Sequence, residues 1–103
     1  MNAVDALQQL PTLYRGGDHV NKTIQFDISQ PTYLRIRDGQ CSAVEGRADD
    51  ADLTLRLSDD DLVDLLNGKL DGTMAVMSGK LKLSGDVMLA QQIETLFDTK
   101  SLL

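Results

Sequence analysis

Five short segments of the chain alternate apolar and polar residues, which is the pattern of β-strands that bury one face. The alternation predicts strands at residues 23–28, 32–37, 40–46, 51–57 and 80–85. Between the second and the third lies Asp38-Gly39, a dipeptide that strongly favours a hairpin turn. Because every predicted strand is one-sided, we expect a mostly antiparallel sheet with one dry face and one wet face.

The alternation also predicts which way individual side chains point in the last two strands. The apolar positions should face the interior; they are Leu53, Leu55, Leu57, Leu81 and Leu83. The intervening polar positions should face water; they are Thr54, Arg56, Lys80 and Lys82.

Between and around these strands the apolar residues recur with the helical period. Residues 3–10 predict a short helix that Pro11 ends or kinks. Ser58 is a candidate N-cap for a helix that stops at Asn67-Gly68. A short helix is predicted within residues 71–79, and a last one begins after Asp86. These helices should cover the dry face of the sheet.

Length and charge narrow the class of protein. A chain of 103 residues with 42% hydrophobic content predicts one globular domain, residues 1–103. The net charge of −6 disfavours a nucleic-acid partner, because that binding depends on basic side chains that neutralise phosphates. No apolar run is long enough to span a bilayer, so stable membrane insertion is not expected. The single cysteine allows no internal disulfide and fits a cytoplasmic protein.

The motifs that carry chemistry in other proteins are not convincing here. The acidic run Asp59–Asp61 lacks the spacing of a calcium loop and suits the first turn of a helix. Residues 72–80 fail the phosphate-loop pattern. His19 is the only histidine and has no evident acidic partner, and Cys41 has no histidine nearby in the sequence. We therefore expect no enzymatic activity, no metal and no cofactor.

One feature leaves two interpretations open. Met74, Met77 and Met88 flank the strand that carries Leu81 and Leu83. Such an apolar stripe is typical of a packed core. Methionine also adapts to varied apolar shapes, and the chain has no tryptophan and only four aromatic residues, so a lined cavity would be pliable. The pattern alone does not choose between core and cavity.

Residues 51–97 resemble the sterol carrier protein type 2 (SCP-2) domain family. The resemblance is carried by SDDDLVDLLNGKL, AVMSGKLKLSGD and MLAQQI, in that order. It implies an α+β fold, a five-stranded mostly antiparallel sheet with helices packed on one face and an apolar tunnel between them. It also implies a non-catalytic protein without a cofactor that binds fatty acids, fatty acyl-CoAs, sterol-like or isoprenoid lipids.

We therefore predict a protein that binds or carries a lipid or fatty-acyl ligand. The alternative is a ligand-free interaction module, or an accessory subunit of a lipid-modifying enzyme or assembly, with a homodimer or an enzyme as its partner. The residues predicted to form the ligand-binding wall, each of which could instead be ordinary core, are Phe26, Leu62, Leu66, Met74, Met77, Leu83, Leu89, Ile93, Leu96 and Phe97.

Overall fold

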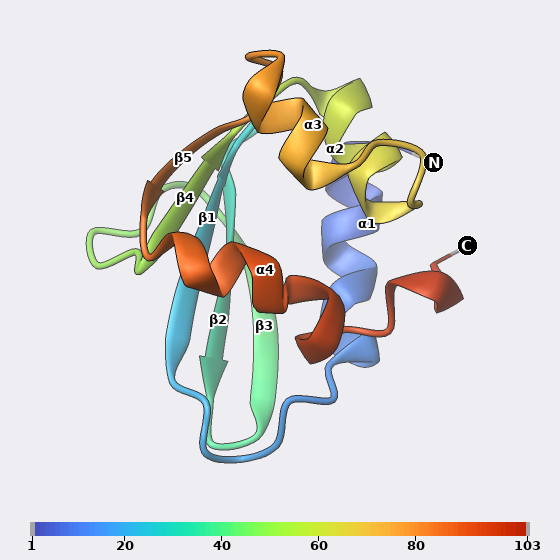
Figure 1. The fold of residues 1–103 in the computed structure, drawn as a ribbon. Helices are drawn as coiled ribbons and strands as arrows, with labels where there is room; N and C mark the ends of the chain where they lie inside the picture. The colour runs from blue at the N-terminus through green and yellow to red at the C-terminus, as the bar shows by residue number, and fades with distance from the viewer. Residues whose placement is uncertain (1, 103) are drawn as a thin grey trace.

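The computed structural model of the protein describes residues 2–102, which form a sheet and a layer of helices (Figure 1). The strands are β1 (Lys22–Asp27), β2 (Thr32–Arg37), β3 (Gln40–Glu45), β4 (Leu53–Arg56) and β5 (Lys82–Gly85). The α-helices are α1 (Ala3–Gln9), α2 (Asp59–Leu66), α3 (Gly72–Met77) and α4 (Val87–Leu96). Two 3₁₀ turns, η1 (Leu10–Leu13) and η2 (Thr99–Ser101), complete the described elements.

The strands form one mixed sheet in the order β3-β2-β1-β4-β5. Three of the neighbouring pairs are antiparallel, and the pair of β1 with β4 is parallel. The β2–β3 turn contains Asp38 at φ 53° and Gly39 at φ 78°, the positive values that a tight hairpin requires. The predicted hairpin and the mostly antiparallel sheet are therefore both confirmed.

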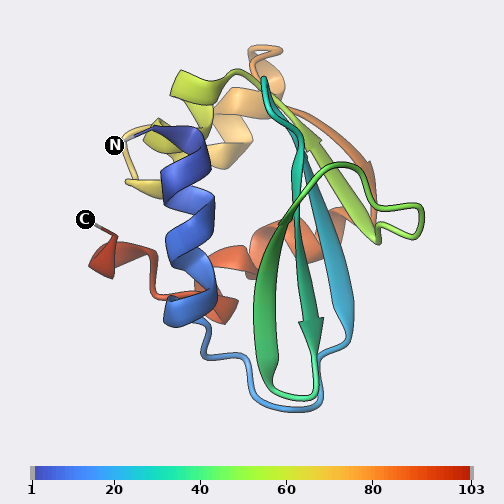
Figure 2. The same cartoon turned by 180° about the vertical axis from the view of Figure 1, so that it is seen from behind.

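The helices pack against one face of this sheet (Figures 1 and 2). Helix α4 crosses in front of the sheet in Figure 1. Helix α1 contacts strand β2. On the sheet surface beneath them, Leu53 and Leu55 are buried and Leu83 is half-buried, whereas Arg56 and Lys82 are exposed. Leu81, which directly precedes β5, is also buried. The predicted orientation of these side chains is confirmed.

The expectation of a fully wet second face is wrong for the central strand. Thr23 and Gln25 of β1 point away from the helices, yet they are 0% and 3% exposed. The reason is topological: the chain leaves β3 at one edge and must pass β2 and β1 to enter β4. Residues 46–52 make this crossing and cover the middle of the face that was predicted to be wet.

Local sequence signals begin and end the helices. The Ser58 hydroxyl accepts a hydrogen bond from the Asp61 backbone N–H at 3.1 Å, which caps α2. Helix α2 then stops at Asn67, and Gly68 follows with φ 78°, as is usual after a helix C-terminus. At the N-terminus, α1 ends at Gln9 and the chain tightens into the 3₁₀ turn η1 at Pro11, as the proline predicts.

Candidate functional site

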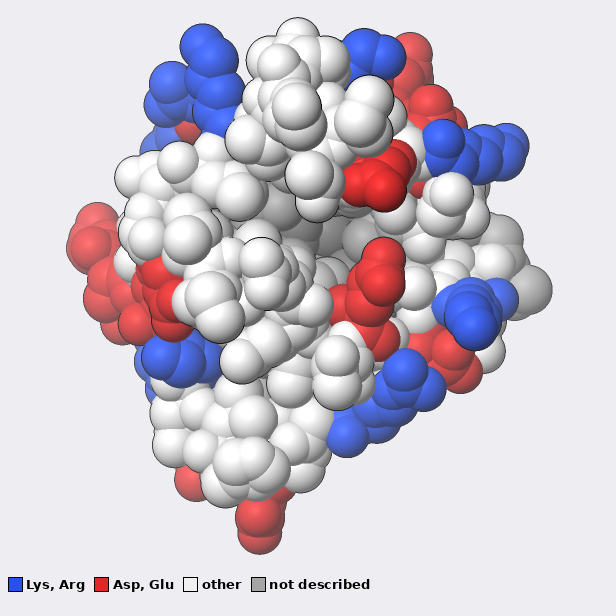
Figure 3. Space-filling view, viewed as in Figure 1, with Lys and Arg blue, Asp and Glu red and all other residues white. Residues whose placement is uncertain are grey.

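A groove with a volume of about 640 Å³ opens on the helix-covered side of the sheet. Figure 3 shows the hollow near the centre of this side of the molecule. Three strands of the sheet and helices α2, α3 and α4 contribute its lining. A space of this size lies within the range of roughly 300–1,000 Å³ that small-molecule sites occupy.

The sheet register builds the floor of the groove. Phe26 of β1 lies opposite Leu55 of β4, and Leu55 lies opposite Leu83 of β5. The three side chains therefore form one apolar row across three neighbouring strands, and all three line the groove. Strand alternation predicted that Leu55 and Leu83 would point inward, and Phe26 is one of the predicted wall residues. Pairing then brings them together, although they are far apart in the sequence.

The helices supply the walls. Helix α2 contributes Leu62, Leu65 and Leu66, which share one helical face because they are three or four residues apart. On the other side Val87, Ala90 and Ile93 of α4 line the groove, and α3 adds Val76 and Met77. Met77 is 77% exposed, so its side chain lies at the opening. The floor, the helical walls and part of the opening of the groove are therefore apolar.

Polar side chains lie along the rest of the lining. They are Asp71, Thr73, Gln91, Glu94 and Thr99. The Asp71 carboxylate accepts hydrogen bonds from the backbone N–H groups of Thr73 at 2.7 Å and Met74 at 3.3 Å, and it thereby caps α3. Acidic residues are visible beside the hollow in Figure 3.

The structure brings six of the predicted wall residues together around the groove. They are Phe26, Leu62, Leu66, Met77, Leu83 and Ile93. That they contact a ligand stays a prediction.

The other four predicted wall residues do not line the groove. Met74 is 59% exposed, and Leu89, Leu96 and Phe97 belong to the packed core. Phe97 packs edge-to-face on Tyr14 with ring centroids 5.6 Å apart, a favourable arrangement for two aromatic rings. Leu89 and Leu96 of α4 thus face the core, and Val87, Ala90, Ile93 and Glu94 of the same helix border the groove.

Several residues that line the groove were not among the predicted wall residues, although the sequence pattern indicated some of them. Leu55 and Leu81 lie at positions that the strand alternation predicted to face the interior. Leu65 shares the apolar face of α2 with Leu62 and Leu66, which were predicted as wall residues. Leu70 and Ala90 offered no such signal, because neither lies in a marked periodic pattern.

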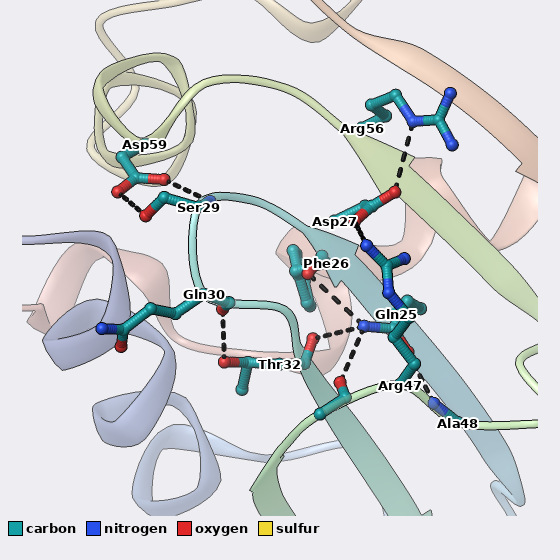
Figure 4. A network of polar contacts seen from close by, with 11 residues as sticks. Gln25, Phe26, Asp27, Ser29, Gln30, Thr32, Arg47, Ala48, Arg56 and Asp59 are labelled. Atoms are coloured by element: carbon teal, nitrogen blue, oxygen red, sulfur yellow. Dashed lines mark hydrogen bonds and ion pairs between the residues drawn. The ribbon is translucent and has the colours of Figure 1, made fainter.

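A separate polar cluster lies on the opposite face of the sheet (Figure 4). The Gln25 side chain donates hydrogen bonds to the carbonyl oxygens of Gly46 at 3.1 Å and Thr32 at 3.4 Å, and it accepts one from the Ala48 N–H at 2.7 Å. These bonds hold the crossing segment on β1. Because the buried Gln25 side chain hydrogen-bonds to backbone groups of both β2 and the crossing segment, its role is structural.

Asp27 extends the same cluster. Its carboxylate forms ion pairs with Arg47 at 2.8 Å and Arg56 at 3.2 Å. The hydrogen bond from Arg47 lowers the pKa of Asp27, and Arg56 lowers it further, while partial burial opposes them. The charged form of Asp27 is therefore favoured in the folded protein.

The single cysteine and the single histidine lie apart from the groove lining. Cys41 is half-buried on β3, and burial raises the pKa of its thiol to about 12. The thiol is therefore protonated at neutral pH, which makes it a poor nucleophile. His19 is exposed on the segment before β1. Within residues 2–102, no group of three or more His, Cys, Asp or Glu side chains could hold a metal ion.

None of the helices formed by the described residues has both the length and the apolar composition to cross a membrane.

Comparison with known proteins reveals consistent similarities. The sequence model of the SCP-2 sterol transfer family matches residues 5–98. Sterol carrier protein 2 from Yarrowia lipolytica, in its apo form, has a TM-score of 0.67 and 32% identity, covering 77% of this chain and 68% of that one. Sterol carrier protein 2 from Aedes aegypti, in complex with palmitate, has a TM-score of 0.71 and 20% identity over 98% and 93% of the two chains. The predicted α+β fold is confirmed.

One of the similar sequences belongs to a much longer protein. Hydroxysteroid dehydrogenase-like protein 2 from Bos taurus is 47% identical over 51 residues, which cover 50% of this chain and 12% of that protein. The chain therefore matches only a small part of this relative.

Proposed function

Because the chain belongs to the SCP-2 sterol transfer family, we propose that it binds and carries a hydrophobic ligand whose apolar part lies in the groove. One observation supports this proposal above the others: a groove of about 640 Å³ with an apolar floor and apolar walls. The Aedes aegypti protein with the same fold is described in complex with palmitate, which is consistent with a lipid as the ligand.

The energy of burial is sufficient for useful binding. Each methylene removed from water contributes about 0.8 kcal/mol, so a tail of about ten carbons gains about 8 kcal/mol. Association opposes this with the loss of translational and rotational freedom. Micromolar affinity corresponds to about 8 kcal/mol, so such an affinity requires a tail somewhat longer than this or additional contacts along the groove.

The test is organic extraction of the purified protein followed by mass spectrometry, together with titration of the delipidated protein with a neutral pyrene-labelled alkyl probe. We expect a co-purified lipid and saturable binding at one site per chain. A protein that carries no lipid and does not take up the probe would contradict the proposal.

A second candidate function is an interaction module that serves an enzyme. Met74 and Met88 favour it, because they are 59% and 61% exposed and do not line the groove. The similarity to part of a longer, dehydrogenase-like protein is consistent with this role as well. The extraction experiment separates the two candidates, because a module without a ligand should yield no lipid.

A further inference from the structure

We propose that Asp71 and Glu94 set the head-group preference of the groove, so that it accepts a lipid with a hydroxyl head and disfavours one with a carboxylate head. The inference rests on the proposed function, because it assumes that the apolar part of a lipid occupies the groove. It names the chemical class of the ligand, an uncharged lipid alcohol.

The interior of the groove dictates where a polar head must lie. The floor consists of Phe26, Leu55 and Leu83, and the α2 wall consists of leucines. A head group placed among these side chains would lose its hydrogen bonds to water and gain none, which is unfavourable for a neutral group and more unfavourable for a charge. The head must therefore remain at the polar part of the lining.

That polar part carries negative charge and no positive charge. Of the described residues that line the groove, Asp71 and Glu94 are the only ionisable ones, and none is lysine or arginine. The Asp71 carboxylate is occupied in capping α3, and it still contributes its charge. The Arg15 guanidinium donates a hydrogen bond to the backbone carbonyl of Glu94 at 3.2 Å.

A neighbouring depression adds no net positive charge. It has a volume of about 530 Å³ and shares Leu66, Gly68, Glu94 and Thr99 with the groove. It contains two basic side chains, Arg15 and Lys100, but also two carboxylates, those of Glu94 and Asp98. A head group that turned toward this depression would meet a surface with no net charge.

The consequence for a ligand follows from electrostatics and hydrogen bonding. A carboxylate head lies close to two like charges and has no cation among the lining residues to offset them, so its binding is weakened. A hydroxyl head has no charge to be repelled and can donate a hydrogen bond to a carboxylate, which is stronger than a bond between two neutral groups. Thr73 and Gln91 can interact with either head.

The experiment compares laurate with dodecanol, which have the same number of carbons and differ in the head. Each competes with the neutral pyrene-labelled probe at pH 8 and about 10 mM ionic strength, where screening is weak. The variants are Glu94→Gln, Asp71→Asn and the double variant. Asparagine is also a good N-cap, so Asp71→Asn should leave α3 intact.

Asp49→Asn is the matched control. It removes one carboxylate from the segment that crosses the opposite face of the sheet, where Asp49 is exposed. The affinity ratio in the unmodified protein includes the different hydration of the two heads. The diagnostic quantity is therefore the change in that ratio upon substitution.

We expect the double variant to bind laurate about three- to tenfold more tightly, with a gain that shrinks in high salt, because two nearby like charges have been removed. Dodecanol should bind equally well or more weakly, and Asp49→Asn should change laurate binding by less than about twofold. Unchanged laurate affinity in the double variant, or an equal gain in Asp49→Asn, would overturn the inference. A protein that binds neither the probe nor either competitor would instead refute the proposed function itself.

Discussion

Replacing Ile93 by tryptophan tests whether the groove is a ligand-binding site or only a packing defect at the edge of the core. Ile93 lies on α4, where it lines the groove and is 8% exposed. The larger indole can extend into the open volume of about 640 Å³. It should therefore occupy space that the ligand needs while displacing few packed atoms.

Leu89→Trp provides the matched control on the same helix. Leu89 is 1% exposed and does not line the groove, so the added atoms have no open space to enter. Overpacking of a close-packed core costs about 1–3 kcal/mol. In a domain of this size each kcal/mol lowers the midpoint of thermal unfolding by about 4–8 °C. We expect a loss of about 5–20 °C for Leu89→Trp and less than about 5 °C for Ile93→Trp.

The assay pairs thermal unfolding, followed by circular dichroism, with titration of the pyrene-labelled alkyl probe. Ile93→Trp should weaken probe binding by about tenfold or more, since a loss of about two buried methylenes already has this effect. Leu89→Trp should bind normally per folded molecule. The reasoning is refuted if Ile93→Trp unfolds as readily as Leu89→Trp while its folded fraction binds the probe with unchanged affinity.

Three further predictions concern other parts of the molecule. Gln25→Leu should lower the free energy of unfolding in urea by about 1–3 kcal/mol, because backbone groups of the crossing segment lose their buried partner; an unchanged urea midpoint would contradict this role. The lowered pKa of Asp27 means that its contribution to stability is present above the ordinary aspartate pKa and is lost as the pH falls through the folded-state value. The unfolding free energy should thus fall less steeply in acid for Asp27→Asn than for the unmodified protein, and identical slopes would refute the assignment. His19→Ala and Cys41→Ala should leave probe affinity within about twofold, because both lie apart from the groove lining and distant sites act independently; loss of binding by either folded variant would reveal a role that the geometry does not predict.

The local structure could be predicted from the sequence alone because its causes are local. Alternation placed Leu53, Leu55 and Leu81 on the buried face, since successive side chains of a strand point to opposite sides. Asp38-Gly39 predicted the hairpin, since both residues tolerate positive φ. Ser58 predicted the start of α2, since its hydroxyl can accept from a backbone N–H of the first turn.

The site itself was only partly predictable, because it depends on contacts between distant segments. The burial of Gln25 follows from the path of residues 46–52 across the sheet, and nothing in the strand pattern encodes that path. The rotation of α4 is also a tertiary property: an apolar stripe shows that a helix face is buried, but neighbouring elements decide what it is buried against. Leu89 therefore became core and Ala90 became groove, although the two are adjacent in the chain.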